Sequence, residues 1–488
     1  MGKILSNTQC PIAHCDDAHL FNLLSIAISP PAGEFNCRVC RKQSMTVSRT
    51  ICLGFLAVIT AGALLLMMPF SISDGTWSDP VTALFTSTSA VCVTGLSVVD
   101  VGKYYSFWGQ LVLVLLVQVG GLGYMTATTF LLLLIGRRFG LRDKIAIQQS
   151  LDQPGLAGMA QLVKSIIATT LVLELTGVFL LLVVFGREYG FGYGLWLSIF
   201  HSVNSFNNAG FSLFSDNLIR YVRSPLVNFA VTALIILGGI GYKVIMEMYL
   251  WLQCRLAKNT SCVVLSLNFK VATSTTIFLL GFGTVAFLLT EYSNPDTFGP
   301  LNFGEKLMAA WFQSVTPRTA GFNTIDIGKM TEVALFFTIG LMFLGASPGS
   351  TGGGIKTTTV RVLFNCTKAV LEGKEEVVCY QRQVPLILIL KSIGVAVGSL
   401  MVVLISTTLI QLTDPQLTFI QVLFEAMSAF GTVGLSTGIT AKVSVLGKLV
   451  LIGTMYTGRV GVLLLMGAIL GDPKPTALRY PEENLYVG

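Results

Sequence analysis

The sequence TSTSAVCVTGLSVVD at residues 86–100 recurs three more times along the chain in related form. Each copy has a Ser or Thr, then a few small or apolar residues, then a glycine followed by Leu or Phe. Successive shared glycines are 115, 111 and 113 residues apart, and near-constant spacing of this kind indicates internal repeats. The other copies are HSVNSFNNAGFSLFSDN (201–217), QSVTPRTAGFNTIDIGK (313–329) and EAMSAFGTVGLSTGIT (425–440).

The composition around these motifs is that of a membrane protein. Of the 488 residues, 53% are hydrophobic and 12% are charged, whereas a soluble domain carries about 25% charged residues. A helix that spans a bilayer needs about 20 mainly apolar residues. Eight stretches meet this need: 50–70, 107–135, 162–185, 225–252, 271–290, 333–371 with an interruption, 385–412 and 445–470.

The order of segments is the same in every repeat. An apolar helix comes first, then a short aromatic stretch, then the glycine motif, and finally a longer apolar helix. The short stretches have at most roughly 15 residues, too few to cross a bilayer, and are typical of re-entrant half-helices. Non-helical backbone at membrane depth is tolerated only where protein buries it or where it lines a water-filled path. The short stretches are 77–90, 196–205, 311–315 and 419–430.

This pattern predicts an all-α integral membrane protein with four parallel helix–pore loop–helix repeats in a pseudo-fourfold arrangement around one pore. We expect five segments: a disordered leader over 1–45, pore repeats over 46–145, 146–260 and 261–375, and a fourth repeat with a cytoplasmic tail over 376–488.

Basic residues indicate the orientation in the membrane. If the N-terminus is cytoplasmic and eight spans alternate, 20 of the 32 Lys and Arg residues lie inside and 8 lie outside. Cytoplasmic loops carry an excess of Lys and Arg in membrane proteins. We therefore predict a multi-pass protein of the cell (inner) membrane with both termini in the cytoplasm. Since no basic cluster alternates with aromatic residues on a soluble domain, a nucleic-acid partner is not expected.

The leader contains four cysteines in a C-x4-C and C-x2-C pattern, namely Cys10, Cys15, Cys37 and Cys40. Such spacing is compatible with a small zinc site. The alternative, which we favour, is a disordered leader without metal, or residues upstream of the true start, since Met45 lies just before the first spanning helix. We expect no metal beyond K⁺.

The glycine motifs have the properties of a K⁺ selectivity filter. Such a filter replaces the ion's hydration shell with rings of backbone carbonyls, and the required backbone conformation is reached most easily by glycine. None of the four motifs places a carboxylate beside its glycine. Half-helices whose negative C-terminal ends face the path would favour a cation. The predicted filter residues are Val93, Thr94, Gly95, Asn208, Ala209, Gly210, Thr319, Ala320, Gly321, Thr432, Val433 and Gly434.

A glycine-rich segment at 347–356 interrupts the closing helix of the third repeat. Pro348 removes a helix hydrogen bond, and the glycines leave the segment without helical stiffness. Ile355 separates Gly354 from Lys356, so the pattern differs from the Gly-Lys-Ser/Thr of a nucleotide-binding P-loop. We predict a flexible gating segment below the filter, with Gly349, Gly352, Gly353, Gly354 and Lys356 as its key residues.

Arg459 lies in the middle of an apolar helix, 25 residues after Gly434. A charge at that depth costs about 2.5–3.5 kcal/mol on insertion scales, so the side chain should face a cavity or a partner. One hypothesis places its guanidinium below the filter as a barrier to cations, held by carbonyls of the 347–356 segment. The alternative is a structural arginine paired with a carboxylate.

These motifs resemble those of the Trk/Ktr/HKT superfamily of K⁺ transporters, and most closely those of its Ktr-type membrane subunits. The likeness covers roughly residues 46–488, including the terminal RYPEENLYVG. It implies a homodimer with one pore per subunit, a cytosolic ring of nucleotide-binding RCK-type regulatory subunits, and K⁺ uptake that depends on Na⁺. It also implies that 347–356 is the intramembrane gating loop and that Arg459 is the pore arginine. In plant relatives a serine at the first filter glycine accompanies Na⁺ transport, so Gly95 implies K⁺ transport here.

Two other functions were weighed. A secondary transporter with alternating access commonly shows inverted repeats and carboxylates along its pathway, whereas these repeats are parallel. A membrane enzyme needs a cluster of His, Cys, Asp or Glu. The chain has only three histidines, two of them in the leader, so neither an enzyme nor a bound cofactor is expected.

Overall fold

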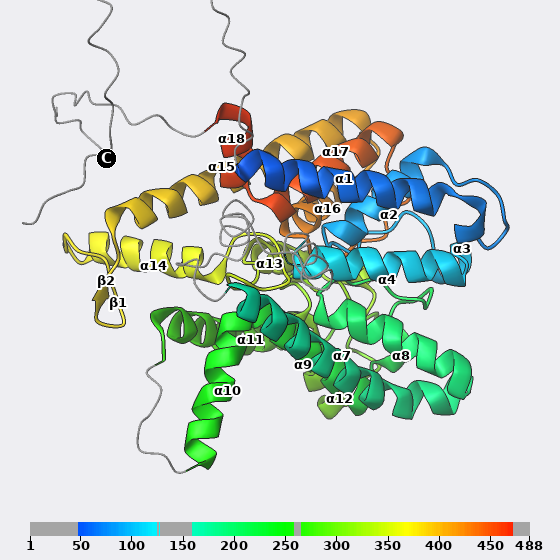
Figure 1. Cartoon of the computed structure of the whole chain (residues 1–488), viewed down its shortest axis with the longest axis horizontal. Coiled ribbons are helices and arrows are strands. Elements are labelled where there is room, and N and C mark those ends of the chain that lie inside the picture. Colours follow the sequence, from blue (N-terminus) through cyan, green and yellow to red (C-terminus); the bar gives the residue numbers. More distant parts are fainter. Residues whose placement is uncertain (1–46, 124–125, 127–158, 258–264, 472–488) are drawn as a thin grey trace, which may run out of the picture. The chain divides into compact units, whose positions relative to one another are not determined.

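A computed structural model describes residues 47–123, 126, 159–257 and 265–471 (Figure 1). The chain divides into two units, Met1–Ser44 and Met45–Gly488, and all described residues belong to the second. The candidate zinc cysteines therefore lie outside the described residues. The described part is all-α, as predicted, apart from one hairpin of strands β1 (Val378–Cys379) and β2 (Arg382–Gln383).

Four long apolar helices open the four repeats: α1 (Val47–Met67), α7 (Met159–Tyr189), α11 (Leu267–Glu291) and α15 (Leu386–Thr413). Each contains a stretch long and apolar enough to cross a membrane. Large apolar side chains stay uncovered on them, such as Phe179 with 70% and Leu289 with 76% of its surface exposed. Apolar surface of this extent is expected where lipid, not water, surrounds the helix.

Each opening helix packs against a short helix that follows it: α2 (Pro80–Val91), α8 (Phe191–Phe206), α12 (Phe303–Val315) and α16 (Phe419–Gly431). Their lengths of 12 to 16 residues agree with the predicted half-helices. The predicted range 311–315 was too short. There the helix already begins after Asn302, where a capping box with Glu305 satisfies the first free backbone N–H groups.

A glycine on the opening helix faces a serine on the half-helix in three repeats. In each pair the serine hydroxyl donates to a backbone carbonyl of the opening helix, and a Cβ on the glycine would collide with the serine oxygen. The absent side chain therefore lets the two helices approach closely. The pairs are Gly62 with Ser87, Gly177 with Ser202, and Gly283 with Ser314.

The closing helices are α4 (Phe107–Leu122), α9 (Pro225–Ile240), α13 (Glu332–Phe343) and α17 (Val445–Val460). The prediction that a longer apolar helix closes each repeat was wrong, because these helices contain only 12 to 16 residues. After α9 the chain turns by 104° into α10 (Tyr242–Leu256), and after α17 by 97° into α18 (Val462–Leu470). After α13 it forms a loop that ends at α14 (Thr357–Leu371). The interruption predicted in the third repeat is present.

Glycines with positive φ end three of the closing helices. Gly123, Gly241 and Gly461 have φ values of +78°, +98° and +88°. Other residues reach this region only at a cost, so glycine allows the chain to leave the helix there. Hydropathy alone does not reveal such a break, because the residues on both sides are equally apolar.

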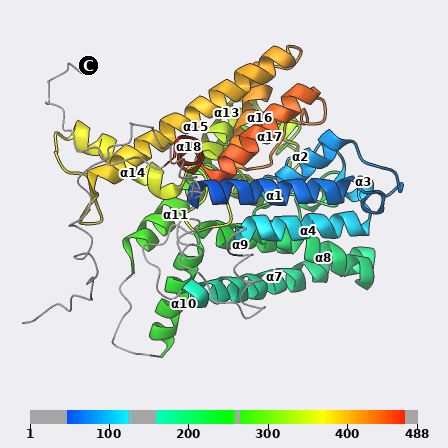
Figure 2. The same ribbon diagram turned by 45° about the horizontal axis from the view of Figure 1, so that its top comes forward.

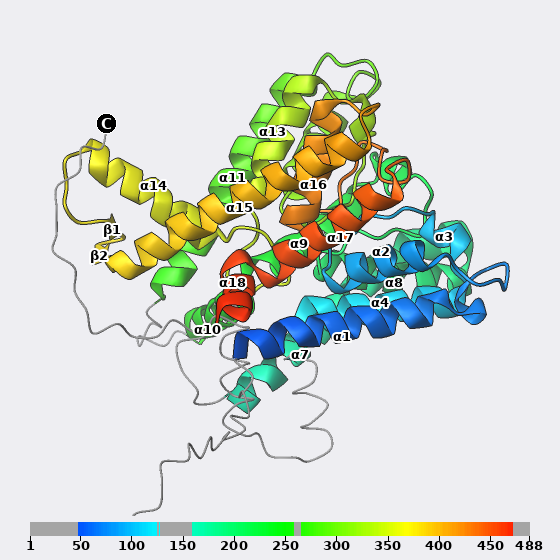
Figure 3. The same cartoon turned by 90° about the horizontal axis from the view of Figure 1, so that it is seen from above.

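The four repeats pack in a closed cycle. The closing helix of each repeat contacts the half-helix of the next one: α4 contacts α8, α9 contacts α12, α13 contacts α16, and α17 contacts α2. Figures 2 and 3 show these helices from two further directions, with α17 beside α2 in Figure 3. The cycle brings the first and fourth repeats together although they are far apart in sequence.

Short elements precede three of the closing helices, namely α3 (Val101–Tyr104) and the 3-10 turns Ile219–Tyr221 and Ile327–Lys329, and a further 3-10 turn, Pro69–Ser71, follows α1. In the third repeat, Thr331 at the start of α13 donates its backbone N–H to Glu291 at the end of α11, at 2.8 Å. In the fourth, Ser444 donates in the same way to Asp414, at 2.9 Å. Each bond fixes the closing helix relative to the opening helix of its own repeat.

Candidate ion pathway

The four motif glycines form a ring. A Cβ placed on Gly95 would come within 3.0 Å of the Ala209 carbonyl oxygen in the second repeat. The same clash would arise between Gly210 and Ala320 of the third repeat, between Gly321 and Val433 of the fourth, and between Gly434 and Thr94 of the first. The cycle closes after four steps. We call Gly95, Gly210, Gly321 and Gly434 the glycine ring.

The backbone around the ring has a repeated conformation that composition did not reveal. Each glycine has a positive φ, from +72° at Gly210 to +90° at Gly434. The residue two positions earlier also has a positive φ in every repeat, although it is not a glycine: Val93, Asn208, Thr319 and Thr432, between +50° and +68°. Left-handed conformations at every second residue turn successive carbonyls to a common side, as a carbonyl-lined path requires.

Hydrogen bonds from the half-helices support this strained backbone. Gly95 donates its N–H to Ser89 Oγ at 3.0 Å, and Gly434 donates to Ser428 Oγ at 3.1 Å. The residue before each ring glycine donates to a carbonyl near the end of its half-helix, as Ala209 does to Asn204 at 2.8 Å and Ala320 to Thr316 at 3.0 Å. Non-glycine residues persist in the left-handed region only where surrounding structure imposes it.

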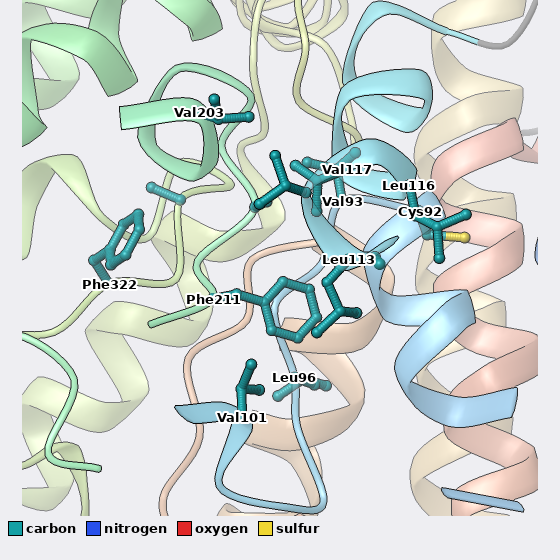
Figure 4. Packing of buried hydrophobic residues seen from close by; sticks show 14 of the residues in the cluster. Cys92, Val93, Leu96, Val101, Leu113, Leu116, Val117, Val203, Phe211 and Phe322 are labelled. Carbon is teal, nitrogen blue, oxygen red and sulfur yellow. The ribbon is translucent and has the colours of Figure 1, made fainter. Parts of the chain in front are cut away.

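Apolar residues next to the ring glycines are buried in two clusters, with Val433 and Leu435 of the fourth repeat in the second of them. Val93, Ala209, Ala320 and Phe322 all belong to one buried cluster. Figure 4 shows Val93 and Leu96 in this cluster together with Leu113 of α4 and Phe211, which follows Gly210. Close packing in a protein interior resists small displacements, so the cluster holds the ring in place.

The 347–356 segment lies directly beside the ring. Gly353 donates its N–H to Thr432 Oγ1 at 3.1 Å, and a Cβ on Gly352 would collide with Thr319 Oγ1. Thr319 and Thr432 are the first predicted filter residues of the third and fourth repeats. Lys356 donates from Nζ to the Gly352 carbonyl at 2.8 Å, inside the segment itself.

The other side of the segment contacts the second repeat. Ser347 donates its N–H to the Gly239 carbonyl at 3.0 Å, and Thr351 donates to the Gly238 carbonyl at 3.2 Å. The Gly349 carbonyl accepts from the Tyr242 N–H at 3.1 Å. The segment therefore joins the glycine motifs of two neighbouring repeats to the break between α9 and α10.

The Arg459 side chain connects the 347–356 segment to the first repeat. Its Nη1 donates to the Thr351 carbonyl of the 347–356 segment, and its Nη2 donates to the Gly120 carbonyl in the first repeat. Gly121 also accepts from Nη2, at 3.5 Å. Among the described residues its hydrogen-bond partners are backbone carbonyls, as the first hypothesis for this arginine expects. All six predicted gating residues thus lie within one connected group.

The glycines at 120–123 recur at 238–241, a repetition that the sequence shows and that is typical of helix contacts or bends. Arg459 belongs to a third copy of this pattern, which was not predicted from the sequence. Gly-Gly-Leu-Gly at 120–123 and Gly-Gly-Ile-Gly at 238–241 end α4 and α9, and Gly-Arg-Val-Gly at 458–461 ends α17. The first glycine of each set packs against the half-helix of its own repeat, at the carbonyls of Val91, Phe206 and Phe430. Arg459 therefore replaces the second glycine. The signal was the spacing of the glycines, which holds in all three repeats.

Asn207, three residues before the ring glycine Gly210, links helices α4 and α7. Its Nδ2 lies 3.0 Å from Glu174 Oε1 on α7 and 2.9 Å from Gln118 Oε1 on α4. Glu174 thus has a hydrogen-bonded structural role in this conformation. Within the described residues, no group of three or more His, Cys, Asp or Glu side chains could hold a metal ion.

Comparison with known proteins agrees with this geometry. A family model described as "TrkH: Cation transport protein" matches residues 33–469. The chain is 38% identical over 452 residues to "Ktr system potassium uptake protein B" of Bacillus subtilis (strain 168), which covers 92% of this chain and 99% of the relative. It is 41% identical over 441 residues to the protein of the same name from Vibrio alginolyticus, with 90% and 94% covered.

A third relative is "Potassium/sodium uptake protein NtpJ" of Enterococcus hirae, 34% identical over 452 residues, with 92% of this chain and 98% of the relative covered. Among solved structures, the crystal structure of the potassium transporter TrkH from Vibrio parahaemolyticus matches with a TM-score of 0.69. It covers 89% of this chain and 86% of its own, and at 18% identity it demonstrates the common fold alone. The resemblance predicted from the motifs is confirmed: the chain belongs to the TrkH family of cation transport proteins, and it is a membrane transporter, not an enzyme.

Proposed function

We propose that this chain is the ion-conducting membrane subunit of a Ktr-type K⁺ uptake system. The names of two relatives that match nearly the whole chain, both potassium uptake proteins, support the choice of ion. The single observation that carries the proposal is the closed glycine ring, in which each missing Cβ makes room for the backbone of the next repeat.

In this proposal the twelve residues predicted as the filter line the path with backbone carbonyls. The left-handed conformations at the first and third positions support such a lining. Carbonyl oxygens are the ligands that replace the hydration shell of K⁺, whereas a divalent-selective filter would usually use a ring of carboxylates. The four structural repeats correspond to the segments 46–145, 146–260, 261–375 and 376–488.

The 347–356 segment is the gate, and Arg459 holds it closed. The bonds from Arg459 to Thr351 and Gly120 support this role, since they link the segment to the opposite side of the path. A guanidinium at this level also repels cations, because a charge in a region of low dielectric acts over a long distance. Opening then requires the segment to leave Thr432 and the α9–α10 break.

The system context is proposed from the relatives. A Ktr system implies a partner, which we take to be a cytosolic ring of nucleotide-binding RCK-type subunits on the inner face, and the membrane subunit works as a homodimer. Dependence on Na⁺ is supported by the name of the relative "Potassium/sodium uptake protein NtpJ". Both termini are cytoplasmic in this proposal, with the protein in the cell (inner) membrane.

Ion flux into liposomes that contain the purified chain tests the function. We expect uptake of K⁺ to exceed uptake of Na⁺ under equal gradients, and K⁺ flux to rise when the regulatory subunits and nucleotide are added. Equal permeability to both ions would reject the filter assignment. Flux that saturates at a slow, carrier-like rate would instead favour alternating access.

A further inference from the structure

The four filter motifs are supported on their outer side in two different ways. Beyond each ring glycine, the chain turns outward, and the second residue after the glycine is polar in all four repeats: Ser97, Ser212, Asn323 and Ser436. In the first and third repeats this side chain bonds only to its own turn. Ser97 Oγ donates to the Val99 carbonyl at 2.5 Å, and Asn323 Nδ2 donates to the Ile325 carbonyl at 2.8 Å.

In the fourth repeat the same residue is held by a buried carboxylate of the half-helix. Ser436 Oγ donates to Glu425 Oε1, and Thr440 Oγ1 lies 3.1 Å from Oε2 of the same side chain. Glu425 is only 1% exposed and stands nine residues before Gly434. The backbone N–H of Gly438 also donates to Ser436 Oγ, at 2.9 Å, so the carboxylate organises the whole outer turn.

In the second repeat a histidine has the equivalent place. His201 stands nine residues before Gly210, and its Nε2 lies 3.0 Å from Ser212 Oγ. Its Nδ1 lies 2.8 Å from the Leu197 carbonyl, which can only accept, so Nδ1 carries the proton. In the neutral ring Nε2 then accepts from Ser212. The imidazole stacks on Phe214, with ring centres 4.9 Å apart.

The corresponding half-helix residues of the other repeats make no such bond. Thr86, nine residues before Gly95, donates back along its own helix to the Thr82 carbonyl at 2.9 Å. Phe312, nine residues before Gly321, has no polar group to offer. The contacts around the glycine ring run from the first repeat to the second, third and fourth in turn, so the second and fourth repeats are diagonally opposite.

From this alternation we propose that Glu425 and His201 are positioning residues for ion selectivity, which hold the outer ends of two opposite filter motifs through Ser436 and Ser212. The inference rests on the proposed filter. In the two opposite motifs the second residue after the glycine is anchored to a buried side chain nine residues before that glycine, whereas Ser97 and Asn323 bond within their own turns. The third motif has a different tie to its half-helix, since Thr316 Oγ1 donates to the Phe322 carbonyl. Where selectivity depends on cavity size, the carbonyl spacing has to resist collapse around the smaller Na⁺. An anchored pair on one diagonal maintains that spacing.

Selectivity, measured as the ratio of K⁺ to Na⁺ flux in liposomes, tests the proposal. We expect Glu425→Ala to lower this ratio by about tenfold, and Glu425→Gln to restore it to within about twofold, because the amide oxygen can still accept from Ser436. Ser436→Ala should lower the ratio as well. The double variant should be no worse than either single one, since both act through one contact.

Thr86→Ala is the matched control, at the same position in a repeat without the anchor, and should leave the ratio unchanged. Size-exclusion profiles establish that each variant is folded, and if Glu425→Ala is not, Ser436→Ala alone decides. An unchanged ratio in Ser436→Ala, or an equal loss in Thr86→Ala, overturns the anchoring role. Gly434→Ser distinguishes the filter hypothesis from the anchoring hypothesis. If Gly434→Ser changes the flux ratio and Ser436→Ala does not, the filter assignment is supported and the anchoring role is rejected. If neither changes the ratio, the filter assignment itself is wrong.

Discussion

The glycine ring and the layer of helix breaks beside it are built from the same four repeats, yet they differ in symmetry. At the ring, all four repeats make the same contact, because each glycine lies against a backbone carbonyl of the next repeat. At the breaks, the first and second repeats have Gly-Gly-x-Gly, the fourth has Gly-Arg-Val-Gly, and the third has a loop at 344–356. A spherical ion is best surrounded by equal ligands, whereas a gate needs one movable part and fixed neighbours. In the function we propose, the symmetric ring is the selectivity filter and the asymmetric layer is the gate.

The largest effect on ion selectivity is expected from replacing one of the four ring glycines. Gly95→Ser should reduce K⁺ over Na⁺ discrimination by more than about tenfold or abolish K⁺ transport. The residue has φ +89°, and its Cβ would collide with the Ala209 carbonyl. Flux of both ions into liposomes measures the effect.

Gly75→Ser is the matched control for this change. Gly75 also has a positive φ, +67°, but nothing lies within 4 Å of its missing Cβ. It should therefore keep wild-type selectivity, with only the backbone strain of about 1–2 kcal/mol. If both variants transport alike, the close contact at the ring has no role in selection.

The next largest effect, on the rate of K⁺ uptake, is expected from shortening the 347–356 segment, the proposed gate. A deletion of residues 349–354 should raise the maximal rate of K⁺ uptake several-fold and weaken control by the cytosolic partner. The deletion removes the Gly353–Thr432 contact and the acceptor of Arg459 at Thr351. A well-folded deletion, judged by its size-exclusion profile, that shows lower or unchanged flux would mean that the segment is structural.

A smaller increase in the rate of K⁺ uptake is expected from Arg459→Ala. This change makes the sequence at the fourth helix break more like those of the first and second repeats, which have a small residue there. Loss of the guanidinium removes a positive barrier and two bonds that hold the segment, so K⁺ uptake should rise by about two- to fivefold. Arg459→Lys keeps the charge but not the forked geometry that reaches both Thr351 and Gly120. A rate in Arg459→Lys equal to wild type would assign the effect to charge, and a rate equal to Arg459→Ala would assign it to the bonds.

The smallest effect is expected away from both layers, at the contact of opening helix and half-helix. Ser202→Ala should lower thermal stability by about 0.5–1.5 kcal/mol, the usual worth of one hydrogen bond, and leave selectivity unchanged. The fourth repeat already has Ala426 eight residues before its ring glycine, where the first two repeats have Ser87 and Ser202. Thermal unfolding in detergent measures the change. A loss of selectivity in Ser202→Ala would show that this contact also shapes the ring.

Much of the architecture was predictable because it depends on local features. The opening helices are long and apolar, and the interruption at 347–356 is rich in glycine, so hydropathy and spacing were sufficient to identify both. The prediction of longer closing helices was wrong for the opposite reason. Gly123, Gly241 and Gly461 lie inside apolar runs, and a positive φ changes the direction of the chain without changing its composition.

Contacts that bring separate parts of the chain together were for the most part beyond prediction from the sequence, although the hypothesis that carbonyls of the 347–356 segment hold Arg459 agrees with its bond to Thr351. Glu425 and Ser436 are eleven residues apart, and neither is unusual by itself. Their bond forms because the chain turns back on its own half-helix after the ring. Arg459 and Gly120 are 339 residues apart, and only the closed cycle of four repeats brings them together.

By itself, the sequence determined that this is a membrane protein of four repeats, each with a glycine motif after a short helix, because hydrophobicity and residue spacing are properties of the chain read in order. The tertiary structure decided which atoms those motifs face. It placed each ring glycine against the next repeat, ended the closing helices early and directed Arg459 toward two carbonyls. These outcomes depend on packing between distant segments, where the space left by one absent side chain is filled by the backbone of another repeat.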